Sequence, residues 1–137
     1  MKKLIIYIFI FFFSFSSQIF AEIFEVENNK IIKLMESGVP LIDIRTEKEW
    51  YQTGIIKDSK TLTFFDKEGN FDIKKWMRKL KKIASEDDPL IIICRSGRRS
   101  RIVSNYLNSK AGYKTIFHAT NGIIAWKDAQ KKTTIPQ

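Results

Sequence analysis

The only cysteine of the chain, Cys94, stands at the junction of an apolar segment and a cationic one. Residues 90–93 are Leu-Ile-Ile-Ile, and a continuous apolar run of this kind is typical of a central strand covered on both faces. After the cysteine come six residues rich in arginine, serine and glycine: Arg95, Ser96, Gly97, Arg98, Arg99 and Ser100. Apolar residues then recur at helical spacing, so the sequence predicts a strand, a short loop that carries the cysteine, and a helix.

A thiol between the end of a strand and the start of a helix lies in a field that favours negative charge. The backbone N–H groups of the loop, the helix dipole and three arginines all contribute to that field. Since the thiolate is the reactive form of cysteine, Cys94 is predicted to be a nucleophile that needs no histidine base. The alternative is an inert buried thiol, which would leave the cationic loop unexplained.

The six residues after Cys94 are predicted to bind a small anion. Gly97 allows the loop to curl until its amides point inward, and Ser96 and Ser100 add hydroxyl donors. For each of the three arginines the alternative is simple solvent exposure. We therefore expect the loop backbone to matter more than any single guanidinium.

The composition limits what else the chain can be. Its 137 residues support one domain, and its formal net charge of +9 favours anionic partners. A single cysteine excludes an internal disulfide, and one cysteine with one histidine provides too few ligands for a zinc site of the usual kind. The sequence therefore predicts no such metal site.

Residues 1–21 have the layout of a secretory signal. Two lysines near the start precede ten apolar residues, 4–13, and a more polar stretch then ends in the small residue Ala21. The apolar run is shorter than the roughly 20 residues of a spanning helix, and an uncleaved membrane anchor is the alternative. We expect cleavage after Ala21, export to the periplasm, and a mature domain of residues 22–137. A lone cysteine in an exported protein also suggests a chemical role, because oxidising compartments tend to use cysteines in pairs.

The remaining chain alternates short apolar runs with helical patterns, which predicts an α/β fold: a mostly parallel sheet flanked by helices on both faces. Strands are expected at 23–26, 41–44, 61–65, 90–93 and 114–117. Helices are expected from the capping residues Asn28 and Asn29, after the capping box of Thr46 and Glu49, after Asp72, after the cysteine loop, and from 121.

The helix expected after Asp72 has one apolar face and one cationic face. The cationic residues are Lys74, Lys75, Arg78, Lys79, Lys81 and Lys82. We interpret this face as a solvated surface, and we expect neither nucleic acid nor a stable membrane contact for the mature domain.

Three segments, in this order, resemble the signature segments of the rhodanese family of sulfurtransferases, specifically its small single-domain exported members. The first, residues 41–56, contains Asp43 and Arg45, followed by Glu-Trp and Gly-Ile-Ile. The second, residues 94–100, is the cysteine with the six residues that follow it, which we call the cradle. The third, residues 121–126, reads Asn-Gly-Ile-Ile-Ala-Trp. The chain departs from the family pattern at Ile55, where the family has histidine, at Ser59, near its usual alanine, and at Asn121, where it has glycine.

The resemblance implies a single rhodanese-like domain in which Cys94 attacks the outer sulfur of thiosulfate or a similar donor. The resulting persulfide would pass its sulfur to cyanide or a thiol, while the cradle holds the anionic end of the donor. No metal or organic cofactor is implied, and we expect a monomer. Asp43 and Arg45 are expected to be structural, holding neighbouring segments to the active loop by a charge-assisted hydrogen bond.

Two alternatives use a similar site. A cysteine phosphatase or arsenate reductase places an arginine six positions after the cysteine, and phosphatases usually carry a histidine just before it; here these positions hold Ser100 and Ile93. A persulfide carrier or redox-partner module would keep the fold and the cysteine but turn over small acceptors poorly. His118, the only histidine, is expected to be a loop residue with a local hydrogen bond.

Overall fold

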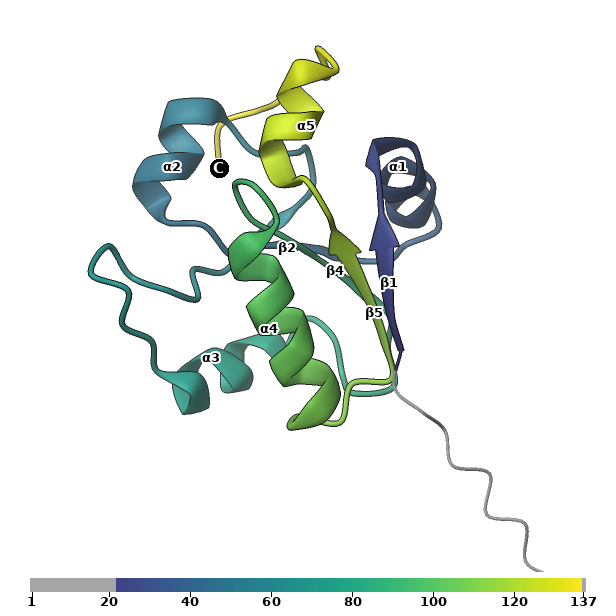
Figure 1. Cartoon of the computed structure of the whole chain (residues 1–137), viewed down its shortest axis with the longest axis vertical. Coiled ribbons are helices and arrows are strands. Elements are labelled where there is room, and N and C mark those ends of the chain that lie inside the picture. Colours follow the sequence, from purple (N-terminus) through teal and green to yellow (C-terminus); the bar gives the residue numbers. More distant parts are fainter. Residues whose placement is uncertain (1–21, 137) are drawn as a thin grey trace, which may run out of the picture.

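The computed structural model describes residues 22–136, so the predicted leader, residues 1–21, lies outside the described part. Over the described residues, five strands and five helices alternate along the chain (Figure 1). The strands are β1 (Glu22–Val26), β2 (Leu41–Asp43), β3 (Lys60–Thr61), β4 (Leu90–Ile93) and β5 (Thr115–Ala119). The helices are α1 (Asn28–Glu36), α2 (Glu47–Thr53), α3 (Ile73–Leu80), α4 (Arg98–Ser109) and α5 (Gly122–Asp128).

The strands form one parallel sheet in the order β1-β5-β4-β2-β3. Strand β4 lies at its centre, where Ile91 pairs with Leu41 of β2 on one side and with Phe117 of β5 on the other. All residues of β4 are fully buried, because helices cover both faces of the sheet. The predicted α/β class, with a parallel sheet and helices on both faces, is confirmed.

Two apolar cores flank the sheet, and the alternation of side chains along β4 decides which core each residue joins. Leu90 and Ile92 pack in the core covered by α3 and α4, whereas Ile91 and Ile93 pack in the core covered by α1 and α5. The period of two continues one residue past the strand. Cys94 therefore lies on the same face as α4.

The strand expected at 61–65 is shorter than predicted, since β3 comprises only Lys60–Thr61. Beyond it, Leu62 and Phe64 turn into the core beside α3. The Phe64 ring meets the Trp76 ring edge-on, with 4.9 Å between their centroids. The backbone N–H groups of Leu62 and Phe64 still donate to the carbonyl oxygens of Asp43 and Ile44, at 2.9 and 3.1 Å, so the chain stays beside β2 after β3 ends.

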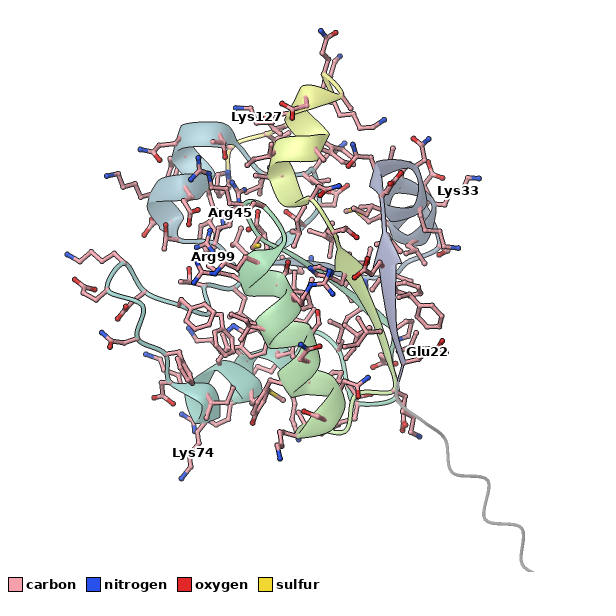
Figure 2. The ribbon with its side chains drawn as sticks, viewed as in Figure 1. Glu22, Lys33, Arg45, Lys74, Arg99 and Lys127 are labelled. Carbon is pink, nitrogen blue, oxygen red and sulfur yellow. The ribbon has the colours of Figure 1, made fainter. Side chains whose placement is uncertain are left out.

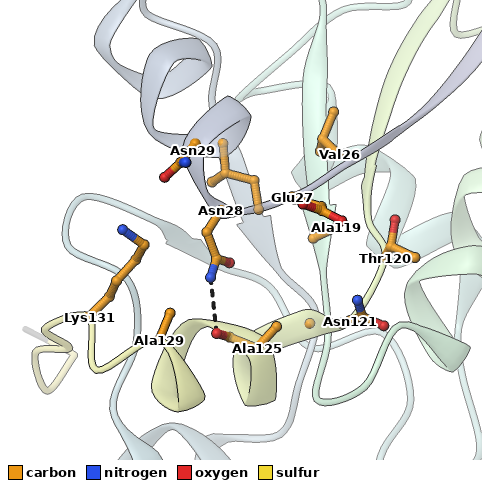
Figure 3. A pocket seen from close by; sticks show the side chains of 12 residues that line it. Val26, Glu27, Asn28, Asn29, Ala119, Thr120, Asn121, Ala125, Ala129 and Lys131 are labelled. Carbon is orange, nitrogen blue, oxygen red and sulfur yellow. Dashed lines mark hydrogen bonds between the residues drawn. The ribbon is translucent and has the colours of Figure 1, made fainter.

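The predicted helix starts at α2 and α3 are confirmed, and the predicted caps of α1 are wrong. Thr46 and Glu49 form a reciprocal capping box at α2, and the Asp72 carboxylate accepts a backbone N–H of α3. Helix α1 starts at Asn28, and no side chain caps it within the described part of the chain. The Asn28 amide instead donates to the carbonyl oxygen of Ala125 in α5, at 2.9 Å (Figure 3). This asparagine therefore links two helices.

Four of the six predicted cationic residues lie on α3, while Lys81 and Lys82 follow it, and all six are exposed. Among residues 22–136, no helix combines the length and the apolar character that crossing a bilayer would require.

Candidate active site

Cys94 follows β4 directly and is buried, with 1% of its surface exposed. Its sulfur accepts the backbone N–H of Gly97 at 3.2 Å and lies 3.3 Å from Oγ of Ser100. Both groups belong to the first turn of α4 and its N-cap, and the 12-residue helix directs the positive end of its dipole to this point. The sulfur therefore lies at a helix N-terminus.

The loop curls at Gly97, as the sequence predicts. This residue has φ +95°, a conformation that favours glycine. A β-carbon here would lie 2.8 Å from the carbonyl carbon of Thr120 and closer still to the carbonyl oxygen. The loop thus requires glycine at this position both for its backbone angle and for space.

The start of α5 holds the loop from the other side. The N–H groups of Ile123 and Ile124 donate to the carbonyl oxygens of Cys94 and Arg95, at 2.9 and 3.1 Å. A β-carbon at Gly122 would lie 2.5 Å from the Cys94 carbonyl oxygen, so only glycine permits this approach. These bonds hold the start of the loop, from which the N–H of Gly97 donates to the sulfur.

Arg99 is the loop arginine with a carboxylate partner among the described residues. It extends from α4 toward α2 (Figure 2) and donates to both oxygens of Glu49, at 2.6 and 2.9 Å. Burial alone would raise the pKa of Glu49, but the hydrogen bonds from Arg99 and Thr46 outweigh it and lower that pKa from 4.5 to about 2. The hydrogen bonds with Glu49 raise the pKa of Arg99, and the nearby sulfur of Cys94 raises it further. Arg99 is therefore a fixed cation beside the loop.

The other predicted cradle residues lie at the surface. Arg95, Ser96 and Arg98 are exposed, and they line an open groove together with Phe65 and Ile102. Among the described residues, the hydrogen bonds of the Cys94 sulfur join it to Gly97 and Ser100 and not to these side chains.

Asp43 and Arg45 form a buried ion pair with a closest approach of 2.6 Å. Arg45 also donates to the hydroxyl of Thr53 at 2.6 Å and to the carbonyl oxygen of Gly54 at 2.8 Å. The pair thus holds the end of α2 rather than the active loop itself, which differs from the expected contact. Its link to the loop is indirect, because α2 carries the carboxylate of Glu49.

His118 is the residue near the cysteine that sequence analysis placed incorrectly. It lies on β5 rather than in a loop, and 1% of its surface is exposed. Its Nε2 lies 2.9 Å from the carbonyl oxygen of Gly97 and 3.0 Å from Oγ of Ser100. Burial lowers the pKa of His118, and the hydrogen bond with Gly97 opposes this only in part. The sequence did contain a signal for this position. Side chains alternate along a strand, so His118 points to the same face as the apolar Ile116, which is the face that α4 covers.

Together these residues provide a buried thiol, one backbone N–H and one hydroxyl group within hydrogen-bonding distance of its sulfur, and exposed arginines near the loop. Within residues 22–136, no group of three or more His, Cys, Asp or Glu side chains is placed to hold a metal ion. The groups around the sulfur are thus the backbone N–H of Gly97 and the hydroxyl of Ser100.

Residues 27–129 match the family described as the rhodanese-like domain. The chain belongs to this family. The match covers every element from α1 to α5, including the Cys94 loop, and confirms the resemblance found in the sequence.

Several proteins are similar to this chain in sequence. Rhodanese-like domain-containing protein 17 of Arabidopsis thaliana is 26% identical over 109 residues, which cover 77% of this chain and 69% of that protein. An uncharacterized protein of Rickettsia prowazekii is 29% identical over 93 residues, which cover 65% of this chain and 72% of that protein.

Solved structures share the fold. The polysulfide-sulfur transferase homodimer from Wolinella succinogenes has a TM-score of 0.64 and 19% identity, over 84% of this chain and 80% of that one. A protein of unknown function from Rhodopseudomonas palustris, described as a possible tyrosine phosphatase, has a TM-score of 0.57 and 24% identity, over 81% and 84%. At these identities the likeness shows a common rhodanese-like fold.

The structure shows the surroundings of two residues that depart from the rhodanese signature. Ile55 is buried, and its backbone exchanges hydrogen bonds of 2.7 and 2.8 Å with Thr134 near the end of the described chain. Asn121 is exposed and has φ −108°, which any residue can adopt. The chain keeps glycine at the next position, Gly122, where the close approach to the loop requires it.

Proposed function

We propose that this rhodanese-like domain is a sulfurtransferase, which moves a sulfane sulfur from thiosulfate or a similar anionic donor to cyanide or a thiol. The observation that supports the proposal best is the setting of Cys94. Its sulfur accepts the Gly97 N–H at the N-terminus of α4, where a backbone donor is in place for a sulfur nucleophile.

In the first half-reaction, the Cys94 thiolate attacks the outer sulfur of thiosulfate. A new S–S bond forms, the S–S bond of the donor breaks, and its electron pair leaves with sulfite. The cysteine retains a persulfide anion, so the total charge is unchanged. In the second half-reaction, cyanide or a thiolate attacks the outer sulfur of this persulfide. The Cys94 thiolate is regenerated, and thiocyanate or a new persulfide leaves.

The loop has groups that can stabilise both the anionic donor and the persulfide anion on Cys94. The first N–H groups of a helix have no acceptor within the helix, and the N–H of Gly97, at the N-cap of α4, donates to the sulfur that would carry the persulfide. Arg95 and Arg98 are exposed at the rim, where they can attract the anionic end of the donor. Because Cys94 is recessed, a donor must offer a sulfur at the end of a narrow group, as thiosulfate does.

The direct test is the intact mass of the reduced protein after incubation with thiosulfate, measured for the wild type and for Cys94→Ala. We expect the wild type to gain one sulfur atom, the variant to gain none, and cyanide to release thiocyanate from the loaded wild type. If the folded protein gains no sulfur from thiosulfate, polysulfide is the next donor to offer, since the Wolinella protein of this fold is named for it. Failure with both donors would refute sulfur transfer at Cys94.

A persulfide carrier is the second candidate, and the almost complete burial of Cys94 favours it. A carrier would load one sulfur as above but release it only slowly to cyanide. The rate of thiocyanate release from the loaded protein therefore separates a carrier from a catalyst.

A cysteine phosphatase is a further candidate, because the Rhodopseudomonas protein of this fold is described as a possible tyrosine phosphatase. Against it, the position six residues after Cys94 is Ser100, and Arg99 is occupied by Glu49. Hydrolysis of p-nitrophenyl phosphate that disappears in Cys94→Ala would favour the phosphatase; we expect none.

We also propose that residues 1–21 direct export to the periplasm and that the mature domain is a monomer. The cationic start and apolar run of the leader support the first proposal. A mature N-terminus at Glu22 in a periplasmic extract, and a monomer mass by light scattering, are the expected results.

A further inference from the structure

His118 sits beneath the active loop, although it comes from a different strand than the cysteine. Its Nε2 lies within hydrogen-bonding distance of two loop atoms, the Gly97 carbonyl oxygen at 2.9 Å and Ser100 Oγ at 3.0 Å. The same serine oxygen lies 3.3 Å from the Cys94 sulfur. The histidine is therefore connected to the proposed nucleophile, Cys94, through the side chain of Ser100.

The partners of His118 determine where its proton lies. A carbonyl oxygen only accepts hydrogen bonds, so the contact with Gly97 requires the proton on Nε2. The other ring nitrogen, Nδ1, is buried and has no partner among the described residues. A second proton on Nδ1 would place an unpaired N–H and a positive charge in this buried position. The ring is therefore neutral and protonated on Nε2.

The carbonyl oxygen of Gly97 has three potential donors and two lone pairs. The backbone N–H of Arg101 donates to it at 3.0 Å, as the first helical bond of α4, and His118 donates at 2.9 Å. The hydroxyl of Ser100, at 3.1 Å, is the third. With the first two bonds made, the serine proton has one further acceptor within reach, the sulfur of Cys94.

We propose that neutral His118 is a positioning residue that directs the hydroxyl proton of Ser100 to the sulfur of Cys94. It does so by occupying the carbonyl oxygen that would otherwise compete for that proton. The inference rests on the proposed use of Cys94 as a nucleophile. In this arrangement the sulfur anion receives a hydroxyl hydrogen bond in addition to the backbone N–H of Gly97.

The charged groups around the ring allow it to stay neutral. Glu25 on β1 is the sheet neighbour of His118, and Arg101 on α4 forms an exposed ion pair with this glutamate. The two charges act on the ring in opposite directions, since Arg101 lowers the pKa of His118 and Glu25 raises it. Cys94, which follows β4, is the group that Ser100 contacts, at 3.3 Å.

The test measures alkylation of Cys94 by iodoacetamide as a function of pH, which requires no sulfur donor. His118→Leu removes the Nε2 donor, whereas the side-chain amide of His118→Gln can replace it. We expect the leucine variant to react roughly tenfold more slowly at pH 7, as for the loss of a hydrogen bond to a charged group, with its rate profile moved to higher pH. The glutamine variant should stay within about threefold of the wild type if the amide takes over the bond.

A double variant tests whether the histidine acts through the serine. In a Ser100→Ala background, His118→Leu should cause no further loss of reactivity, because the hydroxyl that it directs is absent. Additive losses, or equal rates for the leucine and glutamine variants, would overturn the inference. If sulfur loading fails but these rates follow the expectation, the proposed function falls and the role of His118 stands.

A measurement on the wild type covers the case in which His118→Leu does not fold. The chain has one histidine, so its ring nitrogens give a single set of ¹⁵N NMR signals. We expect the Nε2–H tautomer throughout pH 6 to 8. A ring protonated on Nδ1, or a cationic ring at pH 7, would contradict the proposal.

Discussion

Replacing Gly97 by alanine should destabilise the domain far more than the same change at Gly112. Both glycines have positive φ, +95° and +77°, so alanine at either position carries a backbone cost of roughly 1–2 kcal/mol. The benefit of a stiffer unfolded chain is also the same at both positions. Their difference therefore isolates the space around the added methyl group.

That space differs completely between the two sites. At Gly112 no atom lies within 4 Å of the new β-carbon, whereas at Gly97 the carbonyl carbon of Thr120 lies at 2.8 Å. Carbon atoms in contact prefer about 3.5 Å, so the loop or Thr120, which follows β5, must move by at least about 0.7 Å. Forcing extra volume into a packed site costs roughly 1–3 kcal/mol. We expect this difference in the free energy of unfolding between the two variants.

Urea unfolding followed by tryptophan fluorescence measures both variants, with the slope of the transition as a check on two-state behaviour. The displacement also moves the Gly97 N–H from the Cys94 sulfur, so Gly97→Ala should lose sulfur loading while Gly112→Ala keeps it. Equal unfolding free energies for the two variants would show that the loop can accommodate a methyl group at position 97, which would refute the argument from space.

Two further changes test the support of the site. Asp43→Asn leaves the buried guanidinium of Arg45 without its counter-charge and should lower the free energy of unfolding by roughly 3–5 kcal/mol. The control Asp87→Asn, at an exposed ion pair, should change this free energy by less than about 1 kcal/mol. Similar losses of unfolding free energy in the two variants would contradict the burial of the Asp43–Arg45 pair. Glu49→Gln keeps the capping geometry but removes an ion pair worth about 1 kcal/mol after solvent screening. Because the pKa of Glu49 falls from 4.5 to about 2 on folding, this contribution should be complete above pH 4.5 and vanish as the pH approaches 2. The exposed Glu47→Gln, as control, should show no such window in parallel pH titrations of stability.

Much of the fold follows from local sequence patterns. The apolar run at 90–93 predicts a central strand, and the capping pairs at Thr46 and Asp72 predict where α2 and α3 begin. These features depend on backbone geometry over a few residues, so they can be recognised without knowing what packs against them. The position of Cys94 between β4 and α4 was predictable for the same reason. By contrast, the strand predicted at 61–65 was too long, because β3 comprises only Lys60–Thr61 although Leu62 and Phe64 still donate to carbonyl oxygens of Asp43 and Ile44.

The contacts of the site side chains depend on the tertiary structure. Three arginines with similar surroundings in sequence become one paired and two exposed side chains, because only Arg99 meets a carboxylate that α2 carries. His118 reaches the loop because β5 pairs beside β4 and the strand alternation turns its ring toward α4. Local propensity sets which residues form a strand or a helix, so the sequence alone determined the position of the cysteine loop between β4 and α4. Strand order and register set which side chains meet across it, and only the folded chain decides them.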